Sequence, residues 1–513
     1  MRFLEYNRSN SKEKWTIMMY MRDFDLMVTY AYALRASNEL SIENIDEILE
    51  KMERDGVYRP RNGGSTFTGQ FKSIQIAWYM FGYYNKSRKK NEKKKLVFSP
   101  LGNLLLDNIK NKEKKMKIFL AMLFGNGFRQ PFSQMDERFN LYPFRLIFKL
   151  LRDSRLKGRL YNDEAFYLIM FLKTIERDSY EELVKDILNL RARDSYDKYI
   201  EFKEYERVLG LASHEWRYFT GMLESAGIVK INNENNNRIV GQFTYGSISK
   251  KTGRPNAVRK YTEDFITLSP ELFNLVDNLL ASYSVYDKPF SEEELSTKFN
   301  SSIVVDMYSF YPPELLDELG MNTKEDKAIA SMLNIANGIN YYSREETQGG
   351  NKFENILADA FNMFIDVEAE RVGGSGRVDI ECLYYISENN CTKFDIEAKA
   401  RNKKLVSINS RRLKTHRIGI GSKYTIVVTP SYSIGVLRDI IDAENTVVIK
   451  SSTLANYFYQ YIVKFGRELS YSTLDGIIVN NFGIDISDKV NSYVYDNFGY
   501  DANDLKLTSA NVK

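Results

Sequence analysis

Strict alternation of apolar and charged residues in a short segment near residue 395 constrains the fold more than any other feature of the chain. In the segment FDIEAKA, the apolar Phe394 and Ile396 alternate with Asp395, Glu397 and Lys399. Side chains of a β-strand point alternately to opposite faces, so this alternation predicts a strand. Glu397 and Lys399 therefore project from one face of a sheet, while the apolar residues enter the core.

A second predicted strand lies just upstream and begins near Asp379. The segment GRVDIECLYYI is typical of a strand, and the polar turn SENNCT separates it from FDIEAKA. A hairpin of the two strands brings Asp379 beside Glu397 and Lys399. Two other acids compete for these places, because Glu381 shares a face with Asp379 and Asp395 shares one with Glu397. The pattern predicts two carboxylates and one ammonium in a single pocket.

This combination of groups suits a hard divalent cation. Two carboxylates bind Mg²⁺ without filling its coordination sphere, and the carbonyl of Ala398 is placed to add a ligand. Such an ion polarises a phosphate and activates water, while the Lys399 ammonium orients that water and offsets developing charge. Two cysteines and two histidines are too few for a site built on those residues. We therefore expect Mg²⁺-dependent phosphodiester hydrolysis, with the ion held by Asp379, Glu397 and Ala398.

An amphipathic helix is predicted immediately before the strands, over Asn351–Asp366. Glu354 lies at the edge of its apolar face and is either a solvated helix acid or a further metal ligand. A basic stretch and the apolar strand Thr425–Thr429 follow the hairpin. The alternative is that the pattern forms no functional site. Asp379 would then be an N-cap or a turn residue, and Glu397 and Lys399 an exposed ion pair worth at most ~1 kcal/mol.

Asp379, seventeen intervening residues and Glu397–Lys399 together resemble the PD-(D/E)xK nucleases. Val378 stands where these enzymes usually have a proline. Glu354 occupies the place of the helix acid found in many of them. The resemblance implies a C-terminal α/β nuclease domain around a mixed central sheet, with both acids, the lysine and Glu354 as catalytic residues.

The length of 513 residues is too great for one ordinary core and predicts two to four domains. A first subdomain, about 1–150, contains a helical pattern and the basic loop Lys86–Lys95. A strand after this loop ends at Ser99, which can cap a helix that begins at Pro100. This order is typical of a winged-helix module, and an ordinary β–α connection is the alternative.

A second winged-helix candidate lies within about 151–285. Its helix has an apolar face that includes Trp216, and the segment IVKINNENNNRIVG after it is predicted to form a hairpin with an Asn-rich turn. A polar segment then carries the cations of a basic wing. These are Lys250, Lys251, Arg254, Arg259 and Lys260. A helix followed by a basic wing suits docking on double-stranded DNA, and a protein-interaction module is the alternative.

The predicted fold is therefore multidomain α+β. Residues 1–285 form a helical, winged-helix-like recognition region, 286–345 a small helical linker, and 346–513 the nuclease domain. Basic residues after the second strand are predicted to hold the DNA backbone. They are Arg401, Lys403 and Lys404, followed by the basic face of Arg411, Arg412 and Lys414.

Over most of its length the chain resembles the AlwI-like type IIS restriction endonucleases and the related BstNBI nicking enzymes. The resemblance rests on the domain order, PLGNLLLDN, the wing-like region at 199–262 and KFEN…GRVDIE…FDIEAKA. It implies cleavage of DNA outside a short asymmetric site. A nicking enzyme, the large subunit of a heterodimer, a DNA-binding regulator and a transposase or repair nuclease remain alternatives. Because one site cuts one strand, a transient homodimer or a small nuclease subunit is an expected partner.

Charge and hydropathy say little about the partner of the protein but argue against a membrane location. Basic and acidic residues nearly balance, 72 against 68, so the net charge of +4 does not identify an acidic partner by itself. No apolar run reaches the roughly 20 residues that span a membrane, and the N-terminus has no apolar signal core. The sequence predicts a cytoplasmic protein without a membrane partner.

Overall fold

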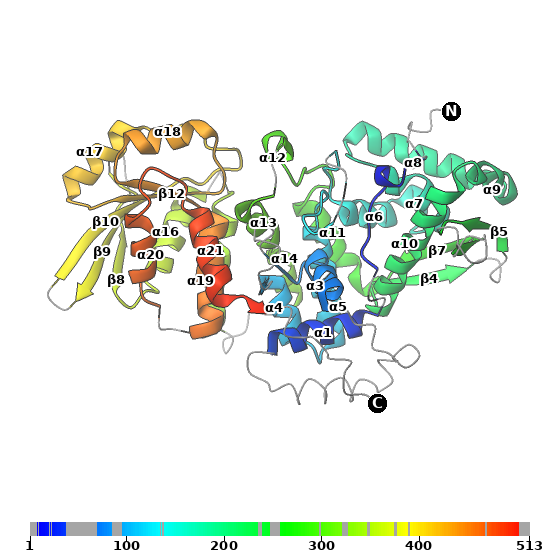
Figure 1. The fold of residues 1–513 in the computed structure, drawn as a ribbon, viewed down its shortest axis with the longest axis horizontal. Helices are drawn as coiled ribbons and strands as arrows, with labels where there is room; N and C mark the ends of the chain where they lie inside the picture. The colour runs from blue at the N-terminus through cyan, green and yellow to red at the C-terminus, as the bar shows by residue number, and fades with distance from the viewer. Residues whose placement is uncertain are drawn as a thin grey trace.

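A mixed five-stranded sheet organises the C-terminal half of the protein in the computed structural model, on the left in Figure 1. The structure describes residues 8, 10–19, 21, 23–36, 69–84, 95–133, 135, 138–233, 239–246, 257–296, 299–320, 327–345, 349–373, 377–387, 390–466 and 469–501. The strands are β8 (Val367–Arg371), β9 (Ile380–Ser387), β10 (Asn390–Ala398), β11 (Thr425–Thr429) and β12 (Thr446–Lys450). Their order is β12-β11-β10-β9-β8, antiparallel from β8 to β10 and parallel from β10 to β12. The predicted hairpin and the predicted mixed sheet are confirmed.

Helices cover both faces of this sheet. They are α16 (Gly349–Phe361), α17 (Ser410–Ile420), α18 (Ile434–Asp442), α19 (Ser451–Phe465), α20 (Ser472–Val479) and α21 (Ser487–Phe498). In β11, Ile426 and Val428 enter the large core of the molecule, whereas Val427 enters a smaller core with Leu413 of α17 and Ile440 of α18. A strand buried on both faces is continuously apolar, as TIVVT is.

The N-terminal half is mainly helical (Figure 1). Its helices are α1 (Phe24–Ala36), α3 (Gly69–Trp78), α4 (Pro100–Asp107), α5 (Lys112–Gly125), α6 (Pro143–Arg152), α7 (Asn162–Tyr167), α8 (Arg177–Arg191), α9 (Ser195–Lys203), α10 (Glu206–Ser225) and α11 (Phe273–Ser282). The predicted start of α4 is confirmed, because the Ser99 hydroxyl accepts a hydrogen bond of 2.9 Å from the Gly102 N–H. None of the helices that the structure describes has the length and apolar character to cross a membrane.

The strands β1 (Gly82–Tyr83) and β2 (Lys95–Phe98) pair antiparallel on either side of the basic loop. Residues 85–94 of that loop lie outside the described residues. The third strand of the sheet is β13 (Tyr500–Asp501), which pairs with β2 and comes from the far end of the chain. The first subdomain is therefore completed by residues that sequence analysis assigned to the nuclease domain.

The second wing-like region differs from prediction in its strand pairing. Its strands are β3 (Leu160–Tyr161), β4 (Val229–Asn233), β5 (Ile239–Thr244), β6 (Val258–Thr262) and β7 (Asp264–Leu268). The predicted hairpin of β4 with β5 is wrong, because β4 pairs with β7 and β5 pairs with β6. The apolar β7 is largely buried and takes partners on both edges, in the order β3-β7-β4. Phe243 of β5 and Tyr261 of β6 instead pack on Phe202 of α9.

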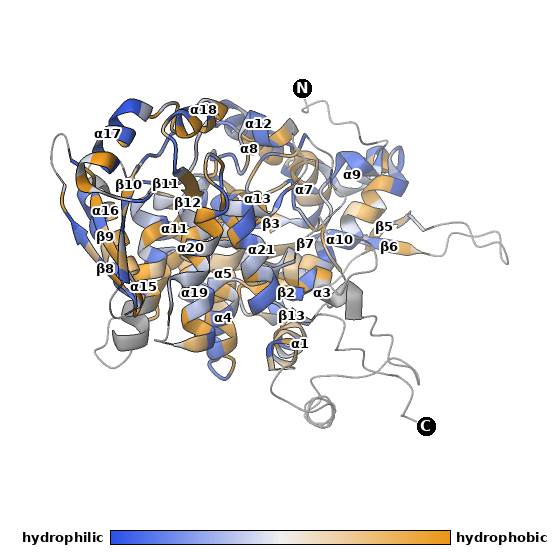
Figure 2. Cartoon of the chain, turned by 60° about the vertical axis from the view of Figure 1, so that its left-hand side comes forward, coloured by the Kyte–Doolittle hydropathy of each residue, from blue (hydrophilic) through white to orange (hydrophobic). Residues whose placement is uncertain are grey.

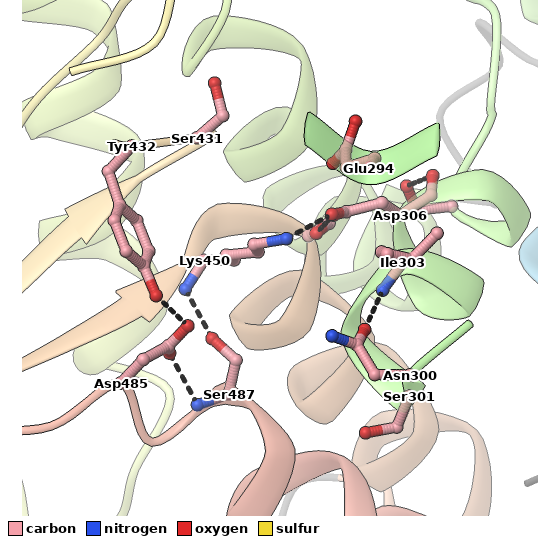
Figure 3. Close-up of polar contacts among 12 residues, drawn as sticks. Glu294, Asn300, Ser301, Ile303, Asp306, Ser431, Tyr432, Lys450, Asp485 and Ser487 are labelled. Atoms are coloured by element: carbon pink, nitrogen blue, oxygen red, sulfur yellow. Dashed lines mark hydrogen bonds and ion pairs between the residues drawn. The ribbon is translucent and has the colours of Figure 1, made fainter. Parts of the chain in front are cut away.

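A helical segment connects the two halves. Its helices are α12 (Glu292–Ser296), α13 (Ser301–Tyr308), α14 (Pro313–Glu318) and α15 (Lys327–Tyr342). Polar contacts tie α13 to the C-terminal sheet. The Lys450 ammonium at the end of β12 lies 3.0 Å from Asp306 Oδ2 (Figure 3), and Ser301 donates a hydrogen bond of 2.6 Å to Asp488. Helix α13 is therefore packed against the C-terminal half rather than extended between two bodies.

Candidate active site

The pairing of β9 with β10 brings Asp379 to the end of β10. Ile380 lies opposite Ile396, so the residue before Ile380 comes beside the last residues of β10. The Ala398 N–H donates a hydrogen bond of 2.7 Å to Asp379 Oδ2. The Lys399 ammonium lies 2.5 Å from Glu397 Oε1 and 3.6 Å from Asp379 Oδ2. The two acids and the lysine predicted from sequence thus share one cluster.

Burial distinguishes the two carboxylates. The Glu397 side chain is 1% exposed, against 18% for Asp379 and 22% for Lys399. Glu397 Oε2 is buried and has no hydrogen-bond partner among the described residues. A buried acceptor without a partner is costly, and in native proteins it usually meets a water, an ion or a ligand. This oxygen is therefore available to a cation.

The fold opposes ionisation of Asp379. Burial and then the negative charge of Glu397 raise the pKa of Asp379 to about 6 from its ordinary 3.8. The Lys399 charge and the hydrogen bond from Ala398 oppose this rise, and Glu354 adds to it. Two acids that resist sharing one pocket as anions gain most from a cation placed between them.

The donor set fits a hard cation. The groups at the cluster are carboxylate oxygens, with the Ala398 carbonyl between Glu397 and Lys399 along the strand. Among the described residues, no three or more acids, histidines and cysteines are grouped to hold a metal ion. Because Mg²⁺ takes six ligands, two acids and one carbonyl would leave places for water and for a substrate oxygen.

Glu354 lies near the cluster but has its own partner. Its Oε2 accepts a hydrogen bond of 2.7 Å from Arg371 Nε, at the end of β8. It is close enough to Asp379 to raise the pKa of that residue. Its role as a ligand stays a prediction. The partner Arg371 was not identified from the sequence, where it stands just before the glycine-rich turn.

The two competing acids lie together, away from Lys399. Asp395 is opposite Glu381 in the β9–β10 register. Burial raises the pKa of Asp395 to about 7. The ion pairs of Lys399 are with Asp379 and Glu397 instead. The geometry favours these two acids over their competitors.

Helix α17 contributes a contact that the sequence did not reveal. Arg412 forms an ion pair with the same oxygen of Glu397 that Lys399 contacts. Asn409 caps the helix, since its side chain accepts a hydrogen bond of 2.9 Å from the Arg412 N–H. The outer side of α17 is largely hydrophilic (Figure 2). The sequence signal was the basic run of Arg411, Arg412 and Lys414, which predicted only a surface for phosphates.

The three cations predicted to contact DNA after β10 differ in their exposure and in their partners. The side chains of Arg401 and Lys403 are exposed, and the Arg401 N–H donates to the Ser343 carbonyl. Lys404 instead pairs with Glu293 of α12 at 2.9 Å. The last of the three cations is thus held by the connecting helices.

The predicted basic wing is described only in part. Lys250, Lys251 and Arg254 lie outside the described residues. Arg259 points to α10, where its guanidinium contacts the His214 ring, and Lys260 is exposed on β6. Burial and then the Arg259 charge lower the pKa of His214.

The solved structures of the restriction endonuclease FokI, alone and bound to DNA, overlap with TM-scores of 0.25 and 0.25, at 12% and 10% identity. The alignments cover 91% and 79% of this chain, and 99% and 80% of the FokI chains, but TM-scores this low establish no shared fold.

Sequence comparison is decisive. Residues 10–283 match the family model described as the N-terminal domain of the type II restriction endonuclease HgaI. The type II restriction enzyme HgaI of Avibacterium volantium is 38% identical over 497 residues, which cover 96% of this chain and 99% of that enzyme. The chain therefore belongs to the HgaI family of type II restriction endonucleases.

Proposed function

We propose that this chain is a Mg²⁺-dependent type IIS endonuclease, which hydrolyses double-stranded DNA outside a short asymmetric recognition site. The observation that carries the proposal is the convergence of Asp379, Glu397 and Lys399 at one end of β9 and β10. Membership of the HgaI family supports it. The resemblance to AlwI-like enzymes supports cleavage outside the recognition site, and the resemblance to the PD-(D/E)xK pattern supports the dependence on Mg²⁺.

Each residue of the cluster has a distinct task. Asp379, Glu397 and the Ala398 carbonyl would hold the divalent ion. Glu354 would become a further ligand only by giving up its hydrogen bond from Arg371. When bound, the ion polarises the scissile phosphate and lowers the pKa of a water. Lys399 holds the attacking water in place and offsets the negative charge that develops on the phosphate. Glu397, nearly free of solvent, acts in surroundings where these charges interact strongly.

The N-terminal half would supply recognition. Helix α10 is followed by β4 and β7, which pair with each other in the sheet β3-β7-β4, and the hairpin β5–β6 is inserted between them in the chain. This arrangement supports a winged-helix-like module within a recognition region of about 1–285. Residues 286–345 would serve as the helical linker and 346–513 as the nuclease domain. Exposed cations such as Lys260, Arg401 and Lys403 would contact DNA phosphates.

The test uses isosteric amides at the cluster. Asp379→Asn and Glu397→Gln should each lower the rate of plasmid cleavage in Mg²⁺ at least about a hundredfold. Binding of the target site, measured by gel shift in Ca²⁺, should persist. Glu381→Gln is the matched control, since it changes an acid of the same strand pair outside the cluster. Normal cleavage by either cluster variant would refute the assignment.

Supercoiled plasmid also tests the number of strands cut. One cluster cuts one strand, so open circles should precede linear product. If the second cut needs another copy of the chain, the linear fraction should rise with enzyme concentration at a constant ratio of enzyme to DNA. Open circles as the final product would instead favour a nicking enzyme.

A further inference from the structure

The two oxygens of the Glu397 carboxylate differ in their partners. Its Oε1 receives both the Lys399 ammonium and the Arg412 guanidinium, whereas the buried Oε2 has no partner among the described residues. The two cations differ in exposure, at 22% for the Lys399 side chain and 46% for Arg412. Lys399 belongs to the strand that builds the cluster, and Arg412 reaches it from a neighbouring helix.

The net charge of the cluster explains what Arg412 does in the metal-free protein. With Asp379 and Glu397 ionised, Lys399 alone leaves the cluster with one net negative charge. Arg412 brings it to neutrality. A divalent ion on the same carboxylates adds two positive charges within a few ångströms of the guanidinium, which it repels. The metal and Arg412 therefore compete for Glu397.

Arg412 is able to leave the carboxylate. Nearly half of its side chain is in solvent, so a change of rotamer opens no cavity. Its backbone is fixed by the Asn409 cap in the first turn of α17, so the side chain moves from a rigid base. A guanidinium matches the geometry of phosphate oxygens in bidentate contacts. The scissile phosphate must lie beside the same metal site.

We propose that Arg412 is an exchangeable counter-ion: it neutralises Glu397 in the metal-free enzyme and transfers to a phosphate of the bound DNA when the metal takes the carboxylate. This rests on the proposed function of the cluster and adds a coupling between metal and substrate. DNA draws Arg412 away and frees Glu397, so DNA binding raises metal affinity. By thermodynamic reciprocity, metal raises DNA affinity by the same factor.

The first measurement is Ca²⁺ binding to the full-length protein without DNA, by isothermal titration calorimetry. Arg412→Ala should bind Ca²⁺ roughly two- to fivefold more tightly than the wild type, because the competing cation is gone. Arg412→Lys should stay near the wild-type affinity. Arg438→Ala is the matched control, since Arg438 is an exposed arginine of the neighbouring helix α18 and makes no ion pair among the described residues. Its Ca²⁺ affinity should change less than twofold.

The second measurement is Ca²⁺ binding with a target duplex present. The duplex should raise Ca²⁺ affinity in the wild type and in Arg438→Ala, but much less in Arg412→Ala. Single-turnover cleavage in Mg²⁺ should fall in Arg412→Ala and recover in part in Arg412→Lys. Unchanged Ca²⁺ affinity in Arg412→Ala, or an undiminished effect of the duplex, overturns the exchange.

Glu397→Gln separates this outcome from failure of the proposed function. If Glu397→Gln loses Ca²⁺ binding while Arg412→Ala behaves as wild type, the metal site stands and the exchange is wrong. If Glu397→Gln binds Ca²⁺ and cleaves DNA normally, the proposed site itself is wrong.

Discussion

Replacing Asp379 with asparagine removes a carboxyl group whose ionisation the fold opposes. Asparagine has nearly the same shape, and its carbonyl oxygen can accept the hydrogen bond that Ala398 now donates. In the metal-free protein, burial and the Glu397 charge raise the pKa of Asp379 from 3.8 to about 6. The variant should therefore be more stable than the wild type, although it loses a carboxylate of the proposed metal site.

The size and pH range of this effect follow from the pKa change. A carboxyl group with a raised pKa binds its proton more tightly in the folded state, so its ionisation destabilises the fold as pH rises from about 4 through 6. Each tenfold change in proton affinity is worth about 1.4 kcal/mol, which gives at most about 3 kcal/mol above pH 6. About half of this penalty remains at pH 5. With an unfolding entropy of about 2.1 cal/mol/K per residue, 3 kcal/mol shifts the Tm of this chain by about 3 °C.

The assay is thermal unfolding in EDTA at pH 5 and at pH 8, with the melting temperature measured by calorimetry. Asp379→Asn should melt up to about 3 °C above the wild type at pH 8 and by about half as much at pH 5. Added Mg²⁺ should raise the Tm of the wild type by mass action and leave the variant unchanged. A variant that melts below the wild type at pH 8 in EDTA would show that the Lys399–Asp379 pair outweighs burial, and would refute the reasoning.

Three further outcomes are expected. Lys399→Ala should retain Ca²⁺ binding by calorimetry but cleave at least about a hundredfold more slowly, and normal cleavage would remove Lys399 from the mechanism. Lys260→Ala should weaken binding equally on specific and random DNA and lower the slope of log affinity against log salt by roughly 0.9; an unchanged slope would mean that β6 faces solvent. Asp306→Asn leaves the buried Lys450 ammonium without its counter-ion and should cost about 3 kcal/mol in thermal unfolding, most of which Lys450→Met in the same chain should restore. Unchanged thermal stability of Asp306→Asn would mean that water already screens the Lys450–Asp306 pair.

The grouping of the candidate site residues could be predicted because its geometry is local. Alternation in FDIEAKA fixes which side chains share a face, and a short hairpin fixes which residues of the preceding strand lie opposite. Asp379, Glu397 and Lys399 therefore come together through interactions within about twenty residues. The same alternation left Glu381 and Asp395 as competitors, since period alone does not show at which end of the hairpin a pocket lies.

Contacts between distant segments could not be read from such patterns. The pairing of β4 with β7 rather than β5 depends on which strand offers the better buried edge. The approach of Arg412 to Glu397 depends on how the loop after β10 returns α17 to the sheet. Neither property has a periodicity that a single sequence displays, because both arise from packing of the complete core.

The same packing bears on the domain boundary expected near residue 345. Across it, the Asn456 amide donates a hydrogen bond of 2.8 Å to the Tyr83 hydroxyl, and Gln460 donates one of 2.7 Å to the Phe98 carbonyl. Both contacts are buried, and β13 adds a strand to β2 in the same place. A fragment cut at this boundary would expose apolar core and leave buried polar groups without partners, each at a cost of about 1–3 kcal/mol. The candidate active site is therefore carried on a surface fixed to the N-terminal half. For a type IIS enzyme, this attachment would make the distance between recognition and cleavage a property of the shape of the protein rather than of a flexible tether.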